Sequence, residues 1–515
     1  QEGEAPDRNA LQDLLARRVR GWHNKTVQFG TRIDWNSREF GQSGFYGFHY
    51  LGWLMPAVRE FVRTDSMRWR RYLIDALTRY YAVRNDLDWP IEGLHPVYYE
   101  LGVAAKHRLV IVTYLALIHT GEVPVDTAEA LLKLLLGFGR SMMRRVKKFI
   151  VHNIHTAGTA ALFRIARTLP EFEESRKWEE LALGHLHRHA DESFFKDGGH
   201  KERCWGYGWG TLSRMTDIYE FAQRTGGMGG KETHYRNRLR TAYRWFAKTI
   251  GPGDLKPAFG DDHLGAAPQI FERGASVFPE GTGRYFGVER ARSWRLRRSG
   301  FAVMRNGDED ESAQLTLTFG QFAGWHSHFD LLSFNFWAEG APLMEELGRY
   351  GSYDHGLDHV FRAPESHNQV LIDGYFYDSR TDKGHDVAWQ SGEKVDYFSA
   401  YHRAYRWVPA MDDRVYAISA DAAVRRTIVF VKDPGYALVL DSVQLEGSSE
   451  FNRSVSAWWH SPYQFEQTGT TSARTKGSPA MLVACAREEG LKRVEIGLDY
   501  AAGEDEDADQ SRWHL

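Results

Sequence analysis

The sequence predicts a multidomain α + β protein in which a helical N-terminal part is followed by an antiparallel β-sandwich. Apolar residues recur at three- and four-residue spacing from the start to about residue 275, which is the period of an amphipathic helix. Beyond Arg298 the pattern changes to short segments in which apolar and polar residues alternate, as in half-buried strands. A chain of 515 residues is also too long for one hydrophobic core. We therefore expect a helical domain over residues 1–280 and a β domain over residues 281–515.

Segments with the helical period follow one another closely in the first domain. They are 57–81, 101–118, 127–143, 150–169, 178–190, 207–222 and 235–250. Short breaks with Gly, Pro or Asp separate them, such as Gly121–Pro124. This pattern predicts paired antiparallel helices, arranged as a solenoid or a closed toroid. No fixed-period repeat is visible, which disfavours an ordinary solenoid.

Strand signals begin after a glycine-rich junction that runs from Gly251 to Gly287. The segment Gln314–Phe319 alternates cleanly, and further short apolar strands are bounded by Asp, Gly or Pro. These further strands are 370–372, 427–431 and 436–440. Short strands at regular spacing favour an antiparallel sandwich.

The composition excludes several classes of function. A net charge of −3 gives no electrostatic case for binding nucleic acid or an anionic membrane. No apolar run approaches the ~20 residues of a membrane span. Two cysteines, Cys204 and Cys485, provide no disulfide framework. The chain begins at Gln1 rather than Met, so we expect an exported protein, periplasmic or secreted, whose signal has been removed.

The stretch Gly324–Asp330 carries the clearest chemical signal. His326, His328 and Asp330 alternate with other residues, which would place all three on one face of a strand. Such a polar face binds a metal or lies in a site where protons move. The alternative is a pair of surface histidines.

Two further motifs lie in the helical part. Asn153 and His155 open a predicted helix, where the dipole and free N–H groups favour an anion; the alternative is helix capping by Asn153 with an exposed histidine. The second motif leads through Glu202 and Arg203 to Tyr207. A tyrosine beside Arg and His can have a lowered pKa, as phenolic acid/base catalysis requires; the alternative is a turn with a packed tyrosine.

Neighbouring strands of the β domain could also assemble a metal site. His328, a glutamate from the Glu345-Glu346 pair and His367 would provide two nitrogens and one oxygen. These residues are far apart in the sequence, so spacing alone does not establish the site.

Together these motifs resemble the heparinase II/III-like polysaccharide lyases. The resemblance is carried by Asn153-Ile154-His155 with Leu169-Pro170-Glu171-Phe172, by Asp197-Gly198-Gly199-His200-x-Glu202-Arg203 with Tyr207, by His326-x-His328-x-Asp330-x-Leu332-Ser333-Phe334, and by His367-Asn368-Gln369-Val370-Leu371-Ile372-Asp373-Gly374. It implies an N-terminal incomplete (α/α) toroid, a C-terminal antiparallel β-sandwich and an active site between them. The implied activity is cleavage of uronic-acid-containing polysaccharides by β-elimination.

The resemblance also implies roles for individual residues. Tyr207 and His326 match the catalytic tyrosine and histidine, and Asn153 and a protonated His155 match the positions that neutralise the uronate carboxylate. The metal ligands would be His328, Glu346 and His367, holding one structural divalent ion, with Zn²⁺ favoured over Mn²⁺ or Ca²⁺. Glu346 replaces the family's usual aspartate, while Cys204-Trp205 and Gly208 replace Ser-Pro and a histidine around the tyrosine.

Further side chains are candidates for contact with an acidic polysaccharide substrate. Glu202 and Arg203 adjoin Tyr207, His200 and Arg362 could recognise sulfates, and aromatic rings could stack on sugars; these rings are Tyr46, His49 and Trp205. Heparan sulfate, chondroitin, hyaluronan and alginate all carry the required carboxylate. Two alternatives stay open: a glycoside hydrolase that uses carboxylates such as Asp261-Asp262 and Glu202, and a non-catalytic glycan-binding protein.

Overall fold

The fold is described from a computed structural model. The described residues are 8–21, 25–87, 95–121, 123–279, 283–324, 326–349, 358–372, 377, 382–406, 422–445, 454–469, 472–476, 481–484, 497–498 and 513–514. They form two compact units. Unit 1 contains the described residues up to 189 and the segment 217–232, and unit 2 contains residues 190–216 and the described residues from 233 onward. No described helix is long and apolar enough to span a membrane.

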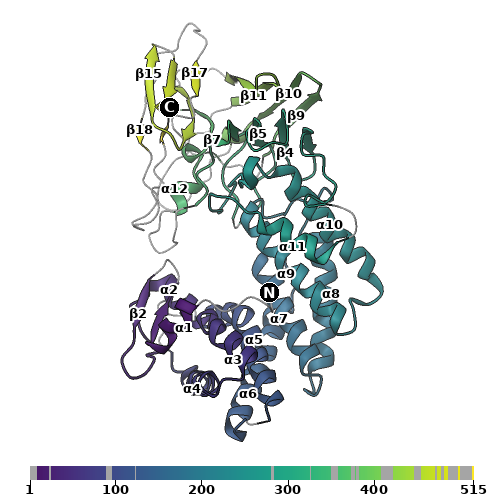
Figure 1. The fold of residues 1–515 in the computed structure, drawn as a ribbon. Helices are drawn as coiled ribbons and strands as arrows, with labels where there is room; N and C mark the ends of the chain where they lie inside the picture. Colours follow the sequence, from purple (N-terminus) through teal and green to yellow (C-terminus); the bar gives the residue numbers. More distant parts are fainter. Residues whose placement is uncertain are drawn as a thin grey trace. The chain divides into compact units, whose positions relative to one another are not determined.

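Unit 1 is helical, apart from one small hairpin (Figure 1). Its helices are α1 (Arg8–Leu15), α2 (Gly41–His49), α3 (Met55–Thr64), α4 (Met67–Val83), α5 (His95–His119), α6 (Val125–Arg145), α7 (Asn153–Thr168), most of α8 (Ser175–Glu192) and the second part of α9 (Trp205–Arg224). The hairpin pairs β1 (Arg18–Arg20) with β2 (Thr26–Gln28). The single helix predicted over residues 57–81 is wrong, because Asp65 adopts a left-handed conformation (φ 50°) that ends α3.

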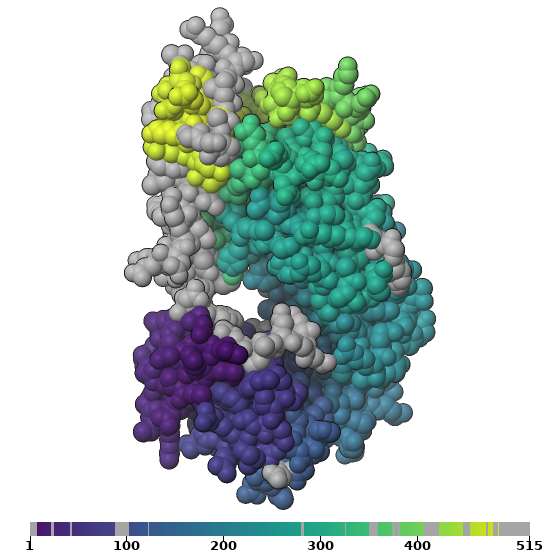
Figure 2. All heavy atoms as spheres, viewed as in Figure 1, coloured from purple at the N-terminus to yellow at the C-terminus, as the bar shows by residue number. Residues whose placement is uncertain are grey.

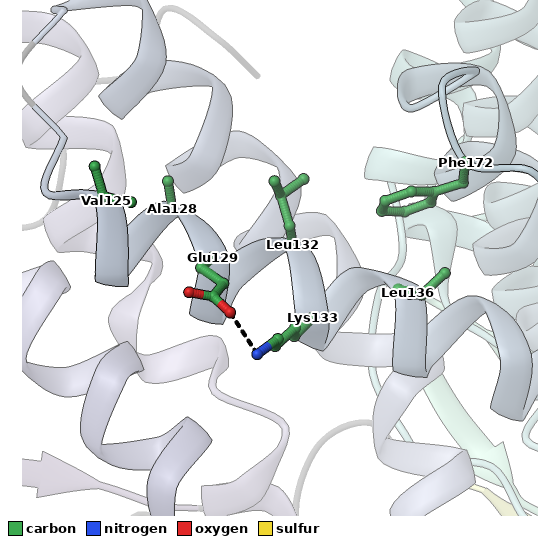
Figure 3. Close-up of a pocket in the computed structure, with 7 residues that line it drawn as sticks. All are labelled: Val125, Ala128, Glu129, Leu132, Lys133, Leu136 and Phe172. Carbon is green, nitrogen blue, oxygen red and sulfur yellow. Dashed lines mark ion pairs between the residues drawn. The ribbon is translucent and has the colours of Figure 1, made fainter.

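An apolar groove runs along the first turns of α6 and reaches Phe172 (Figure 3). Its lining residues are Val125, Ala128, Glu129, Leu132, Lys133, Leu136 and Phe172. Glu129 and Lys133 form an ion pair of 2.5 Å one helical turn apart. None of the predicted site residues lines this groove.

Unit 2 contains two main antiparallel sheets, as the strand pattern predicts. The first has the order β3-β4-β5-β6-β7 and the second β12-β11-β10-β9. The strands of the first are β3 (Trp294–Leu296), β4 (Phe301–Arg305), β5 (Gln314–Thr318), β6 (Phe334–Ala338) and β7 (Ala341–Met344). Those of the second are β9 (His385–Ser391), β10 (Val395–His402), β11 (Ala422–Val431) and β12 (Tyr436–Leu445), which form a continuous green to yellow-green surface in Figure 2.

Side chains from both sheets share one hydrophobic core. Leu315 and Leu317 of β5 lie in the same buried cluster as Phe398 of β10 and Ile428 and Phe430 of β11. Two sheets that bury their facing side chains in this way form a β-sandwich. The smaller strands are β8 (Gln369–Ile372), β13 (Val455–Trp458), β14 (His460–Ser461), β15 (Phe465–Gly469), β16 (Ser472–Thr475), β17 (Leu482–Ala484), β18 (Gly497–Leu498) and β19 (Trp513–His514).

Helices also pack within unit 2. They are the start of α9, α10 (Glu232–Thr249), α11 (Gln269–Val277) and the short α12 (Asp358–Arg362). Arg305 at the end of β4 donates hydrogen bonds to the carbonyl oxygens of Lys248 (2.9 Å) and Ile250 (2.6 Å) at the end of α10. Arg305 therefore connects the end of helix α10 to the five-stranded sheet by hydrogen bonds.

The stretch predicted to place His326, His328 and Asp330 on one strand face is not a strand. Its described residues form turns and irregular backbone, and β6 begins only at Phe334. Leu332 has a positive φ of 62°, which is incompatible with an extended strand. The three polar side chains therefore do not line one face of a strand.

Candidate active site

Asp261 is the centre of the candidate site in unit 2. Its Oδ2 lies 2.9 Å from Nδ1 of His326, and its Oδ1 lies 2.9 Å from Nε2 of His328. The guanidinium of Arg362 donates to both oxygens, with Nε 3.2 Å from Oδ1. Asp261 is 3% exposed, so one buried carboxylate joins two predicted site histidines and a predicted substrate-binding arginine.

These contacts determine the charge of Asp261. Burial alone would raise its pKa, but hydrogen bonds from His326 and His328 and the ion pair with Arg362 hold the pKa well below its usual range. Asp261 is therefore ionised at neutral pH. Burial lowers the pKa of His328 although Asp261 opposes that effect, so His328 is neutral there.

Tyr207 lies directly against His326. The two rings are stacked with centroids 3.5 Å apart and planes 7° from parallel. Tyr207 sits in the first turn of α9, and the loop before that helix contributes Glu202, whose Oε2 is 3.7 Å from Nε2 of His326. The Ser327 hydroxyl donates to the Glu202 carbonyl oxygen at 2.9 Å. The fold thus brings together the predicted catalytic tyrosine and histidine.

His328, Glu346 and His367 form a second buried group. Each is at most 1% exposed, and the ring centroids of the two histidines are 5.3 Å apart. Nδ1 of His367 donates to Oε2 of Glu346 at 2.5 Å, and the Ser333 hydroxyl donates to the other oxygen. Burial disfavours charge on both partners, but their contact lowers the pKa of Glu346 and raises the pKa of His367, so they form a buried ion pair.

The chemistry of this group fits a divalent metal. Nδ1 of His328 and Nε2 of His367 are buried without a hydrogen-bond partner, and imidazole with carboxylate is a donor set typical of Zn²⁺. A metal ion would displace the second proton of His367. Glu202 and His326 belong to a separate set of potential metal donors in the same unit. Histidine and glutamate side chains that can hold an ion are therefore present, and their arrangement does not select one metal.

Asp330 takes a different environment from the two histidines that precede it. Burial raises the pKa of Asp330 to about 6, although the positive charges of His367 and Arg203 act to lower it. Its side chain is 6% exposed. Asp330 therefore belongs to the buried surroundings of the second group.

The predicted carboxylate-binding residues lie at the start of α7 in unit 1. The helix begins at Asn153 and is capped by His152, whose Nδ1 accepts from the backbone N of Ile154 at 3.1 Å. His155 is buried, with Nδ1 2.8 Å from Nε2 of His189. Burial lowers the pKa of His155 to about 4, so the positive charge expected on this histidine at neutral pH is corrected to a neutral ring.

Two side chains predicted to contact substrate are packed inside unit 2. Arg203 donates to the Ser299 carbonyl oxygen and the Thr318 hydroxyl, and Trp205 Nε1 donates to the Thr249 hydroxyl at 3.0 Å. Both are buried, at 6% and 2% exposure. They support the fold around Tyr207 and do not line the site.

Three other rings predicted to contact substrate are also buried. In unit 1, His49 is fully buried with Nε2 3.0 Å from the Trp35 carbonyl oxygen, and burial lowers its pKa to about 3. Tyr46 on the same helix is 5% exposed. In unit 2, His200 is 4% exposed and packs against the edge of Phe194. Stacking of Tyr46 or His49 on a sugar face, or a sulfate contact by His200, would require the ring to leave its core.

The sequence alone does not link Asp261 to Tyr207 and His326. From the sequence, Asp261 is a candidate only as a carboxylate for the hydrolase alternative, because nothing in the spacing links it to His326. The close approach depends on Gly260, which has a positive φ of 75°. A Cβ at that position would lie 2.5 Å from the His326 carbonyl oxygen. A Gly-Asp pair in a glycine-rich junction is the signal that was available.

Comparisons with known proteins identify the family of this chain. Residues 10–285 match the family "Heparinase II/III N-terminus", and residues 288–504 match "Heparinase II/III-like, C-terminal". A curated heparin-sulfate lyase from Bacteroides stercoris is 22% identical over 192 residues, which cover 35% of this chain and 29% of that relative's length.

Solved structures show the same fold. A crystal structure of heparinase III aligns with 95% of this chain and 77% of its own, with a TM-score of 0.75 and 15% identity. The heparan sulfate lyase HepC from Pedobacter heparinus aligns with 100% of this chain and 81% of its own, with a TM-score of 0.65 and 14% identity. The predicted fold class is thereby confirmed. Since the two family matches together span most of the sequence, the chain belongs to the heparinase II/III family.

Proposed function

We propose that the protein is a polysaccharide lyase that cleaves uronic-acid-containing polysaccharides by β-elimination. The observation that carries the proposal is the stack of Tyr207 on His326, with His326 held by the ionised Asp261. Heparan sulfate is the first substrate to test, because the similar proteins are named as heparin- or heparan-sulfate lyases. Chondroitin, hyaluronan and alginate offer the same carboxylate. Such polymers lie outside the cytoplasm, so export is part of the proposal.

The chemistry needs a base, an acid and stabilisation of negative charge. The base removes the proton at C5 of the uronate, the C4–O bond breaks, a C4–C5 double bond forms, and the leaving oxygen receives a proton. Tyr207 can perform both proton transfers when the two groups lie on the same side of the sugar. For the opposite geometry, His326 is the base and Tyr207 the acid.

The surroundings of His326 suit the role of base. After it takes a proton, the imidazolium would lie between two carboxylates, with Asp261 Oδ2 at 2.9 Å from Nδ1 and Glu202 Oε2 at 3.7 Å from Nε2. Both stabilise a charge that is absent before the proton transfer, which is the condition for catalysis.

Groups other than the acid and the base must stabilise the negative charge on the substrate carboxylate. We assign an amide hydrogen bond from Asn153 to this task and, because the ring of His155 is neutral at pH 7, no charge from His155. Arg362, whose side chain is 27% exposed, is the candidate cation next to His326. A metal ion held by His328 and His367, with Glu346 orienting His367, would hold these loops in place and supply positive charge.

The test is product analysis with a Tyr207→Phe variant. The wild-type chain should release products with the ultraviolet absorbance of 4,5-unsaturated uronate, whereas a hydrolase would give saturated ends. Loss of the phenolic hydroxyl should lower the rate at least about 100-fold, because it removes the acid/base group. Tyr436→Phe is the matched control, since it removes a hydroxyl from an exposed strand position. Full activity of Tyr207→Phe would overturn the assignment.

A further inference from the structure

We infer that Asp261 is a positioning residue that fixes the tautomers of two histidines at once, so that each presents its lone pair away from the shared carboxylate. The inference deepens the proposed function and rests on it for its catalytic consequence. Nothing in the sequence spacing links Asp261 to either histidine, and the contacts in unit 2 carry the assignment.

The loop that carries Asp261 is joined to His326 through both backbone and side chain. The Asp261 backbone N donates to the His326 carbonyl oxygen at 3.0 Å, and the carboxylate meets the imidazole of the same residue. Gly260 allows this approach, because an added Cβ would also lie 2.9 Å from Cβ of Cys204. Asp261 therefore has a defined position relative to His326.

The carboxylate can only accept hydrogen bonds. Arg362 donates to both of its oxygens, and a guanidinium in this forked contact pairs with the ionised form of a carboxyl group. Each imidazole nitrogen that faces Asp261 must therefore carry the hydrogen. These nitrogens are Nδ1 of His326 and Nε2 of His328.

In the neutral form of each ring, the opposite nitrogen carries the lone pair. For His326 this is Nε2, on the side of Glu202, where it can accept a proton. For His328 it is Nδ1, which is buried without a hydrogen-bond partner and can bind a cation. One carboxylate thus prepares one histidine for proton transfer and its neighbour for metal ligation, and both assignments follow from the atoms that contact Asp261.

The experiment combines a spectroscopic readout with kinetics. Protein labelled with ¹⁵N-histidine is studied by NMR at about pH 8, where an unperturbed imidazole is neutral, and His326→Gln and His328→Gln assign the two signals. The expected result is a hydrogen on Nδ1 of His326 and on Nε2 of His328. In Asp261→Asn, the His326 signal should change, and kcat on a uronate polymer should fall about 100-fold or more with KM within about threefold.

The matched control is Asp254→Asn. Asp254 is another buried aspartate of unit 2 that pairs with an arginine and a hydroxyl, Arg284 and Tyr285, away from the two histidines. It should keep the wild-type histidine signals and kcat within about twofold. A hydrogen on Nε2 of His326 in the wild-type protein, or an unchanged kcat in folded Asp261→Asn, would overturn the inference.

The two proposals can fail separately. If the wild-type chain gives no unsaturated product from any uronate polymer, the proposed function fails. The NMR measurement on the wild-type chain then still decides the tautomers, since it requires no turnover.

Discussion

Several buried histidines of unit 1 are neutral in the folded chain, and each connects stability to pH. His107 on α5 is 5% exposed, with Nδ1 3.1 Å from the Val103 carbonyl oxygen. Burial, aided by nearby Arg164, lowers its pKa to about 3. The unfolded chain would bind a proton near pH 6.5 and the folded chain would not, so the free energy of unfolding falls as the pH drops below about 6.5.

A His107→Leu variant should therefore lose less stability in acid than the wild-type chain. From pH 6.5 to pH 4 the imidazole contributes a loss of at most about 3 kcal/mol, which the variant would lack. Urea unfolding at several pH values measures the difference. His119→Leu, at an exposed position of the same helix, should keep the wild-type pH dependence. Parallel stability curves for wild type and His107→Leu would contradict the prediction.

At the residue scale, the sequence singles out individual candidate side chains better than their partners. His326 and Tyr207 were predicted from motifs, and they stack in the structure. Asp261 was not assigned to them because hydrogen bonds across long sequence separations leave no periodic pattern. The burial of Trp205 and His49 could not be predicted from the sequence either, since aromatic and imidazole rings occur both in cores and in binding sites.

At the scale of elements, helix packing in unit 1 makes two glycines of α6 respond in opposite ways. Gly139 is buried, and a Cβ there would overlap the indole ring of Trp178 on α8. Gly137 is exposed, and nothing lies within 4 Å of an added Cβ. Substitution of either glycine by alanine gains up to about 1 kcal/mol of helix propensity. The difference in stability between the two variants therefore measures the effect of packing at residue 139.

Gly139→Ala should destabilise the chain by about 1–2 kcal/mol, because overpacking costs more than the propensity gain. Gly137→Ala should instead stabilise it by about 0.5–1 kcal/mol. Denaturant unfolding of the two single variants measures both values. Equal changes of the same sign would show that α6 and α8 do not pack as described.

Elements themselves were predictable where the pattern was long and regular. Helices α5 to α10 and strands β5, β11 and β12 all overlap predicted segments, because burial of one face imposes a period on the sequence. The break between α3 and α4 was missed because it depends on a single left-handed residue, Asp65. The stretch before β6 was misread as a strand because alternating polar residues also arise where an irregular loop contacts different partners.

At the scale of the whole molecule, the packing of unit 2 joins helices and sheets that the sequence pattern separates. Arg305 is central to this. Besides the carbonyl oxygens of Lys248 and Ile250, it donates to the Arg290 carbonyl oxygen at 2.8 Å and to Oε1 of Gln314 at 2.6 Å. The hydrophobic period reports which face of an element is buried and not which element covers it, so this connection could not be predicted.

Arg305→Gln should therefore loosen α10 and the five-stranded sheet together. The shorter neutral side chain would leave buried carbonyl oxygens without donors, at a cost of about 3 kcal/mol or more. Amide hydrogen exchange should then rise both in the last turn of α10 and in β4 and β5. Arg474→Gln is the control: Arg474 is 60% exposed in its ion pair with Glu466, and such pairs contribute at most about 1 kcal/mol. Faster exchange confined to α10, with β4 and β5 unchanged, would show that Arg305 caps the helix without coupling it to the sheet.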